Sequence, residues 1–164
     1  MKQLGTMLLP LVLLAMPPQL ALSETKAPQG IARLKSLVGE WRGKDVEGRA
    51  VQVTYSLTAG NTAVLETLEV AAGLSMVTLY HPDNEKLMMT HYCILGNQPR
   101  MQGDMDDRSL TFSLIDATNL SSPGAAHMRK LVMSFPDNDH LRHEWTMRAG
   151  GQDKIEVFKF ERKK

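Results

Sequence analysis

Apolar and polar residues alternate with a period of two along most of the chain after residue 40. Between residues 51 and 57, apolar odd positions alternate with Gln52, Thr54 and Ser56, which is typical of a strand with one buried face. Similar segments predict strands over residues 41–45, 51–57, 63–70, 75–81, 86–93, 100–105, 110–114, 128–135, 140–147 and 155–160. About ten short strands joined by regularly spaced turns predict an all-β sandwich or a closed antiparallel barrel.

A helical period precedes the strands. Apolar residues between Ile31 and Val38 recur at three- to four-residue spacing, and Gly39 follows them. This pattern predicts a short N-terminal helix that ends at the glycine. Residues 24–30 are polar with one proline and predict a flexible leader. We therefore expect the barrel domain to span residues 31–164.

Residues 1–23 have the composition of a secretory signal peptide. Lys2 is followed by the apolar run Met7–Met16, and Ala21-Leu22-Ser23 offers small residues for cleavage. The alternative is an uncleaved membrane anchor, but the run is shorter than the roughly 20 residues that span a bilayer. We expect a periplasmic or secreted protein that is not inserted in a membrane after cleavage.

Charge and cysteine content narrow the classes of partner. The chain has 19 Lys and Arg against 18 Asp and Glu, and Lys2 is the one charged residue before Glu24. The expected mature chain is therefore balanced at 18 against 18, which argues against a nucleic-acid partner. Cys93 is the single cysteine, so an internal disulfide is impossible. An exported domain of this kind relies on its apolar core alone.

Two turns share the tripeptide Pro-Asp-Asn, at residues 82–84 and 136–138. Proline presets the first turn residue and asparagine tolerates a left-handed backbone, so we expect three-residue hairpin loops. Phe135 would then pair with Asp139 in the second hairpin. One face of that hairpin is mainly apolar and is expected to be interior: Leu131, Met133, Phe135, Leu141, His143, Trp145 and Met147.

The first hairpin contains a short internal sequence repeat, Met-x-Thr-x-Tyr, at residues 76–80 and 88–92. A three-residue loop closed by His81 and Glu85 would place both copies on one face. The other face would then hold Val77, Leu79, Leu87, Met89, His91 and Cys93. Neither face is clearly polar. We therefore expect one face to be covered by the barrel interior and the other by the helix or by a second subunit, which leaves a homodimer open.

The segment Leu37-Val38-Gly39-Glu40-Trp41-Arg42-Gly43 opens the strand series. A Gly-x-Trp motif after a short helix, followed by many antiparallel strands, resembles the calycin group, which includes lipocalins, fatty-acid-binding proteins and haem-binding nitrobindins. The resemblance implies a calycin-like barrel in which an arginine from the last strand caps the tryptophan, here Arg162 over Trp41. Nitrobindins ligate iron through a histidine near the C-terminus, whereas here the last histidine, His143, precedes one more strand.

A second resemblance involves Thr90-His91-Tyr92-Cys93 and, three residues later, Asn97-Gln98-Pro99-Arg100-Met101. This segment looks like an uncharacterised family of exported bacterial proteins. The resemblance implies export and no particular activity.

A barrel of this size encloses room for one small ligand, and such pockets combine apolar walls with a few polar groups. The candidates for that mixture are Tyr80, Thr90, His91, Tyr92, His143 and Trp145. The alternative is that their polar tips are satisfied by core partners. Asn97 and Arg100 stand in a polar loop that would clamp a carboxylate at the barrel mouth, unless that loop is an ordinary turn.

Soft metal binding is a second hypothesis. Met88, Met89, His91 and Cys93 are ligand types that favour Cu(I). Residues two apart on one strand lie about 7 Å apart, so Met76 or Met101 from a neighbouring strand would be needed. The alternative is that the methionines fill the core. No metal site is assigned from the sequence, and no cofactor is identified.

Catalysis receives little support from the sequence. No nucleophile elbow, phosphate loop or dinucleotide fingerprint is present. Glu66, Glu69 and Glu144 are isolated acids on strands that we expect to be solvated. The pattern favours a non-catalytic, exported protein that binds a small, largely apolar ligand. Cu(I) binding, a structural domain with a filled barrel and an uncharacterised enzyme stay as alternatives.

Overall fold

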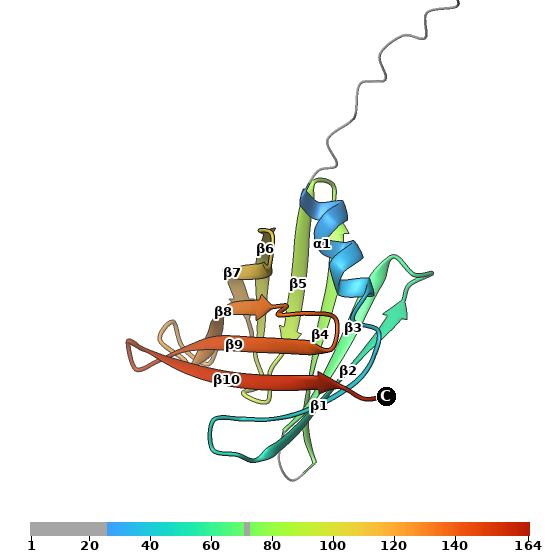
Figure 1. The fold of residues 1–164 in the computed structure, drawn as a ribbon. Coiled ribbons are helices and arrows are strands. Elements are labelled where there is room, and N and C mark those ends of the chain that lie inside the picture. The colour runs from blue at the N-terminus through green and yellow to red at the C-terminus, as the bar shows by residue number, and fades with distance from the viewer. Residues whose placement is uncertain (1–25, 71–72) are drawn as a thin grey trace, which may run out of the picture.

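A computed structural model describes residues 26–70 and 73–164. Ten antiparallel strands form a closed, calycin-like barrel in the order β1-β10-β9-β8-β7-β6-β5-β4-β3-β2 (Figure 1). The elements are α1 Lys26–Lys35, β1 Gly39–Lys44, β2 Ala50–Thr58, β3 Ala63–Val70, β4 Leu74–Asp83, β5 Lys86–Tyr92, β6 Gln98–Met105, β7 Ser109–Thr118, β8 His127–Ser134, β9 His140–Ala149 and β10 Gln152–Arg162. The predicted all-β barrel is confirmed. The expected signal peptide lies outside the described residues.

The barrel closes where β1 pairs with β10. Trp41 pairs with Arg162 and Gly43 pairs with Phe160. The glycine is needed here because a Cβ at position 43 would lie 1.9 Å from the Lys159 carbonyl oxygen. Closure removes the exposed sheet edges that would otherwise pair with other chains.

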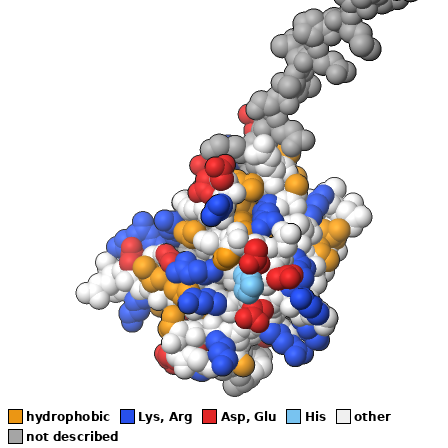
Figure 2. Space-filling model, viewed as in Figure 1, with side chains coloured by type: hydrophobic (Ala, Val, Ile, Leu, Met, Phe, Trp, Pro, Cys, Tyr) orange, Lys and Arg blue, Asp and Glu red, His pale blue; other side chains and the backbone are white. Residues whose placement is uncertain are grey.

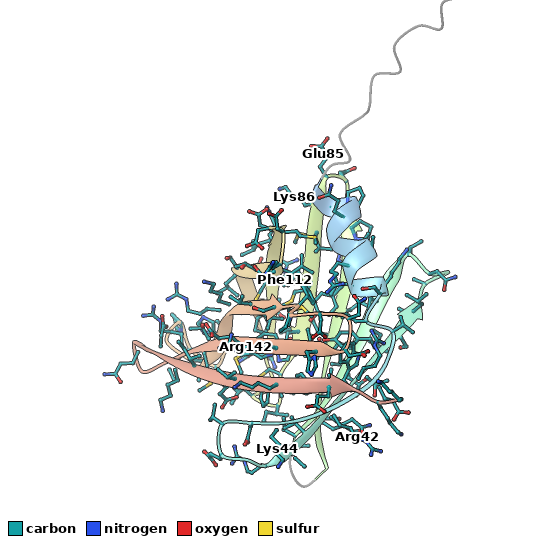
Figure 3. The ribbon with its side chains drawn as sticks, in the orientation of Figure 1. Arg42, Lys44, Glu85, Lys86, Phe112 and Arg142 are labelled. Carbon is teal, nitrogen blue, oxygen red and sulfur yellow. The ribbon has the colours of Figure 1, made fainter. Side chains whose placement is uncertain are left out.

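Helix α1 covers one end of the barrel, beside the β4–β5 turn. Figure 3 labels Glu85 and Lys86 at this turn, next to the helix. The helix packs closely enough that a Cβ on Gly30 would meet the Leu87 side chain at 2.7 Å. It begins at Lys26, so residues 26–30 of the expected leader are helical. The opposite end of the barrel, which we call the mouth, has the β1–β2, β5–β6, β7–β8 and β9–β10 connections.

Arg162 links the C-terminal end of helix α1 to the barrel. Its guanidinium lies 4.1 Å from the centre of the Trp41 ring, as the calycin resemblance implies. The same group donates hydrogen bonds to the carbonyls of Val38 at 3.0 Å and Ser36 at 2.9 Å. The Trp41 indole N–H donates to the Leu37 carbonyl at 2.8 Å. One arginine therefore stabilises the connection between α1 and β1 and the closing strand pair together.

The β8–β9 hairpin has the predicted interior face. His143 is fully buried, and Leu131, Met133, Phe135, Leu141 and Trp145 are buried with it. The predicted closing pair of Phe135 and Asp139 is wrong, because the ladder ends at Ser134 and Arg142 and leaves a longer loop. The register is displaced by two residues, an even number, so every side chain keeps its predicted face.

The predicted register of the β4–β5 hairpin is wrong. Asp83 pairs with Lys86, so the turn consists of Asn84 and Glu85, with Asn84 at a φ of 53°. The asparagine adopts the left-handed backbone as expected, but at the first position of a two-residue turn and not at the last position of a three-residue loop. Because the register differs by an odd number of residues, β5 is inverted relative to β4. His91 and Met89 therefore face inward with Thr78 and Tyr80, while Thr90 and Tyr92 face outward.

The face of the barrel that is seen in Figure 2 is mixed in charge. Figure 2 shows Lys and Arg interspersed with Asp and Glu on the face in view, with hydrophobic side chains between them. Arg42, Lys44 and Arg142, labelled in Figure 3, come from strands β1 and β9. Within residues 26–70 and 73–164, no helix has the length and hydropathy that crossing a membrane requires.

Candidate functional site

A carboxyl group, Glu66 on β3, is fully buried inside the barrel. Val64 and Leu68 flank it on the same inward face, so the expectation of a solvated acid is wrong. The Tyr80 hydroxyl donates to Glu66 Oε2 at 2.8 Å, and the Thr78 hydroxyl lies at 3.5 Å from Oε1. The Tyr55 hydroxyl is close enough to lower the pKa of this carboxyl. Hydroxyl groups from β2 and β4 thus surround one acid.

Burial controls the protonation of this carboxyl. Loss of hydration raises the pKa of Glu66 to about 7, although the hydrogen bonds from Tyr55, Tyr80 and Thr78 act in the opposite direction. Burial also raises the pKa of both tyrosines well above the ordinary value, and the nearby carboxylate adds to that effect. The tyrosines therefore stay protonated as donors.

Two buried histidines extend the network. The Thr78 hydroxyl lies 2.9 Å from His91 Nδ1, and the Tyr55 hydroxyl lies 2.8 Å from His143 Nε2. Burial lowers the pKa of His91 to about 4 and that of His143 to about 3. Both rings are consequently neutral at physiological pH, with one nitrogen protonated and the other carrying a lone pair.

Three buried polar atoms in this region have no hydrogen-bond partner among the described residues: His91 Nε2, His143 Nδ1 and Trp145 Nε1. The His91 and Trp145 rings are in contact, with centroids 4.6 Å apart. Unpartnered buried polar atoms are rare in folded proteins and often mark a functional position. We call the following seven residues the polar layer: Tyr55, Glu66, Thr78, Tyr80, His91, His143 and Trp145.

A pocket of about 570 Å³ lies at the mouth. Four of its lining residues are buried, Met76, Cys93, Met128 and Phe158, and Met147 is partly buried beside them. Thr78, His91 and Trp145 are each two residues deeper along the same inward strand faces than Met76, Cys93 and Met147. The polar layer therefore lies one step below the pocket floor. Its three unpartnered atoms are occluded from water, so a ligand reaches them by displacing the floor side chains.

Exposed apolar side chains stand among the charged residues at the rim of the pocket. Ile155 is 58% exposed and Val46 is 71% exposed, and both line the pocket. Three further large apolar residues are exposed at this rim: Leu74, Ile94 and Leu95. Clustered exposed apolar residues typically mark an interaction site.

The structure divides the predicted site residues into two groups. Tyr80, His91, His143 and Trp145 are brought together in the polar layer. Thr90 and Tyr92 are outside the barrel, and Tyr92 is 51% exposed. The two-residue β4–β5 turn is the reason, because it inverts the face of β5.

The expected carboxylate clamp at residues 97–100 is not formed. Arg100 faces outward on β6 and pairs with Asp116 of β7. Asn97 is buried and donates from Nδ2 to the Ala126 carbonyl at 2.9 Å, which links the β5–β6 loop to the β7–β8 loop. Gln98 is held by the Thr118 hydroxyl at 2.8 Å. These polar side chains stabilise the local chain.

Three residues of the polar layer were missed by sequence reasoning: Tyr55, Glu66 and Thr78. The alternation of inward and outward positions along the strands indicated the direction of the first two side chains, because Tyr55 continues the inward face of Val51 and Val53. Glu66 stands between Val64 and Leu68 in the same way. An acid at an inward position of an otherwise apolar face is the informative feature.

The sulfur-containing residues are distributed differently from the expected copper set. Met88 faces outward on β5, whereas Met89 and Met101 are buried. Among the described residues, no group of three His, Cys, Asp or Glu is arranged to hold a metal ion. Burial raises the pKa of the Cys93 thiol, so this cysteine stays protonated. A protonated thiol is a poor nucleophile.

Comparisons of the chain with protein-family models and with curated proteins found no match. Sequence similarity therefore assigns neither the Gly-x-Trp motif nor the segment at residues 90–101 to a family.

Proposed function

We propose that this protein is an exported, non-catalytic carrier or receptor for a small, largely apolar ligand held inside the barrel. One observation carries the proposal: three buried polar atoms without partners, at His91, His143 and Trp145, lie below an apolar pocket. A buried unpartnered polar atom costs about 1–3 kcal/mol. A ligand that supplies partners recovers part of this cost, so the arrangement favours binding.

The pocket entrance supports an apolar ligand. The exposed side chains of Val46 and Ile155 give an apolar molecule a surface to contact before it enters. The floor contains Met76, Met128 and Met147. Methionine side chains are flexible and polarisable, so this floor adapts to ligands of different shape.

The proposal also includes a relationship between this chain and a known group of ligand-binding barrels. We infer that the chain is related to the group of lipocalins, fatty-acid-binding proteins and nitrobindins. The contact between Arg162 and Trp41 supports this relationship. Export to the periplasm or the medium is part of the proposal and is supported by the composition of residues 1–23.

Native mass spectrometry of the mature protein, purified from the host that exports it, tests the proposal. We expect an excess mass that is lost on denaturation and is absent from a His91→Leu, Trp145→Phe double variant. A His81→Leu, Trp41→Phe double variant is the matched control, since neither residue belongs to the polar layer. Near-native circular dichroism of each variant shows that it is folded. A bare wild-type mass, with no uptake of apolar compounds added afterwards, would contradict the proposal.

A second candidate is Cu(I) binding in the same pocket. The observation that favours it is that four sulfur-containing side chains line one pocket: Met76, Cys93, Met128 and Met147. Thioether and thiol groups prefer Cu(I). Competition for Cu(I) against a colorimetric chelator tests this candidate in wild type, in Met147→Leu and in the outward-facing control Met88→Leu. Cu(I) binding would be supported if Met147→Leu weakens the retention of Cu(I) and Met88→Leu does not. If the wild-type protein retains no Cu(I), this candidate is excluded.

A further inference from the structure

The hydrogen bonds of the polar layer specify which atoms of a ligand it accepts. Each hydroxyl has one proton. While Glu66 is ionised, the hydroxyls of Tyr80 and Thr78 donate that proton to its carboxylate. The Thr78 oxygen is then an acceptor toward His91. His91 Nδ1 is therefore the protonated nitrogen of its ring.

The opposite ring nitrogen follows from this assignment. In a neutral imidazole only one nitrogen carries a proton. His91 Nε2 is consequently a bare lone pair, and it is unpartnered. Trp145 Nε1 is a donor in every state. The neighbouring rings of His91 and Trp145 thus offer one acceptor and one donor to whatever occupies the interior.

Charge at the site disfavours anions. The buried polar residues of the described chain are Glu66, Thr78, His91, Asn97 and His143, and this set contains no Lys or Arg. The charged residues that line the mouth pocket are three acids, Asp45, Glu47 and Glu156, and two bases, Arg49 and Lys154. In the interior, below this pocket, a carboxylate ligand would therefore lose its hydration beside Glu66 without a buried cation to pair with.

We infer that the interior site takes an uncharged ligand with a hydroxyl group, an apolar alcohol or phenol, and rejects the corresponding carboxylate. The inference rests on the proposed function and names the ligand class of that site. A hydroxyl donates to an imidazole lone pair and accepts from the indole N–H. An ether only accepts, and a carboxylate only accepts and is charged.

Protonation of Glu66 changes the hydrogen bond that the ligand makes. The proton of the neutral carboxyl is then donated to a neighbouring hydroxyl. If Thr78 receives it, its own proton becomes available to His91 Nδ1, and Nε2 becomes a donor. A ligand hydroxyl then rotates to accept, and an ether is accepted as well, so the preference for a hydroxyl over an ether belongs to the ionised state of Glu66. The groups that face Glu66 are Tyr55 from β2 and Thr78 and Tyr80 from β4, with His143 from β9 and His91 from β5 reached through these hydroxyls.

The test is a displacement titration on the unaltered mature protein, with the uncharged fluorescent probe N-phenyl-1-naphthylamine. The competitors are 4-butylphenol, 4-butylanisole and 4-butylbenzoate at pH 8, which share one apolar body and differ in the polar group. We expect the phenol to bind at least about tenfold more tightly than either competitor, the factor that one unmade hydrogen bond gives. Equal affinity for phenol and anisole, or tighter binding of the benzoate, would overturn the inference.

The titration distinguishes a failure of the proposed function from a failure of the inferred ligand class. If neither the probe nor any competitor binds, both the proposed function and the inference are overturned. If the probe binds but the order of competitors differs, only the ligand class is overturned. In a His91→Leu variant the preference for phenol over anisole should fall at least threefold, whereas His81→Leu should keep it. An undiminished preference in folded His91→Leu would overturn the assignment of His91 as the acceptor.

Discussion

At the scale of single residues, the interior acid Glu66 has the largest consequence for stability. It is the one acid among the buried residues of the described chain, and its carboxyl is contacted by hydroxyls of Tyr80 and Thr78. Its environment combines loss of hydration, which opposes ionisation, with hydrogen bonds that favour it. The balance places the pKa near neutrality, so small changes in pH alter the charge inside the barrel.

The first prediction is a pH-dependent difference between wild type and Glu66→Gln. The pKa of Glu66 is raised by burial from its ordinary 4.5 to about 7. The stabilising contribution of the protonated form is thus fully present below pH 4.5 and is lost as pH rises through about 7. Relative to Glu66→Gln, the wild-type free energy of unfolding should fall by about 3 kcal/mol over this window. Urea denaturation at several pH values measures it, and parallel curves would contradict the predicted titration.

The second prediction compares the two tryptophans. Trp41→Phe removes an indole N–H that donates to the Leu37 carbonyl, whereas Trp145→Phe removes one that has no partner. Loss of an existing hydrogen bond lowers the free energy of unfolding by about 1 kcal/mol, whereas removal of an unpartnered N–H breaks no hydrogen bond. Without ligand, Trp41→Phe should therefore be the more destabilised variant by about 1 kcal/mol in urea denaturation. The reverse order would show that Trp145 Nε1 is satisfied in the native state.

At the scale of elements, turn geometry decides which predictions succeed. Alternation alone placed His143 and Trp145 on the inward face of β9, and an error of two residues in the register left that unchanged. The same reasoning failed for Thr90 and Tyr92, because the β4–β5 turn is one residue shorter than expected. Side-chain direction has a period of two along a strand, so only odd errors invert a face.

The third prediction concerns closure of the barrel by β1 and β10. A Cβ at position 43 would meet the Lys159 carbonyl oxygen at 1.9 Å, so Gly43→Ala forces the two strands apart. We expect a loss of more than about 2 kcal/mol in the free energy of unfolding. Gly124→Ala is the control, because a Cβ there meets nothing within 4 Å. Equal stability of the two variants would mean that β1 and β10 do not approach this closely.

At the scale of the whole molecule, the two ends of the barrel differ. Helix α1 and Arg162 close one end, while the other has exposed apolar side chains at the rim of a pocket of about 570 Å³. The polar layer lies between them. The unpartnered atoms of His91 and Trp145 lie on the side of the methionine-lined floor, so the proposed function predicts that a ligand enters from this end.

The fourth prediction tests the entrance. Ile155 and Ile115 are both exposed isoleucines on strands, at 58% and 54%, but only Ile155 lines the mouth pocket. Ile155→Ser should slow the uptake of an uncharged apolar probe severalfold in stopped-flow fluorescence, because it removes apolar contact at the rim. Ile115→Ser should leave the rate unchanged. Equal rates in wild type and both variants would place the entrance elsewhere.

The sequence by itself determined the strand series, the short helix and the barrel class, while the contact of Arg162 with Trp41 was expected from the calycin resemblance. Alternation and glycine positions are local, and they act within a few residues of chain. The composition of the polar layer was decided by tertiary structure. Glu66, Thr78 and His91 come from three strands, and their convergence depends on the exact register of each hairpin. A difference of one residue in a turn, which sequence patterns do not resolve, decides whether a side chain faces the interior or the solvent.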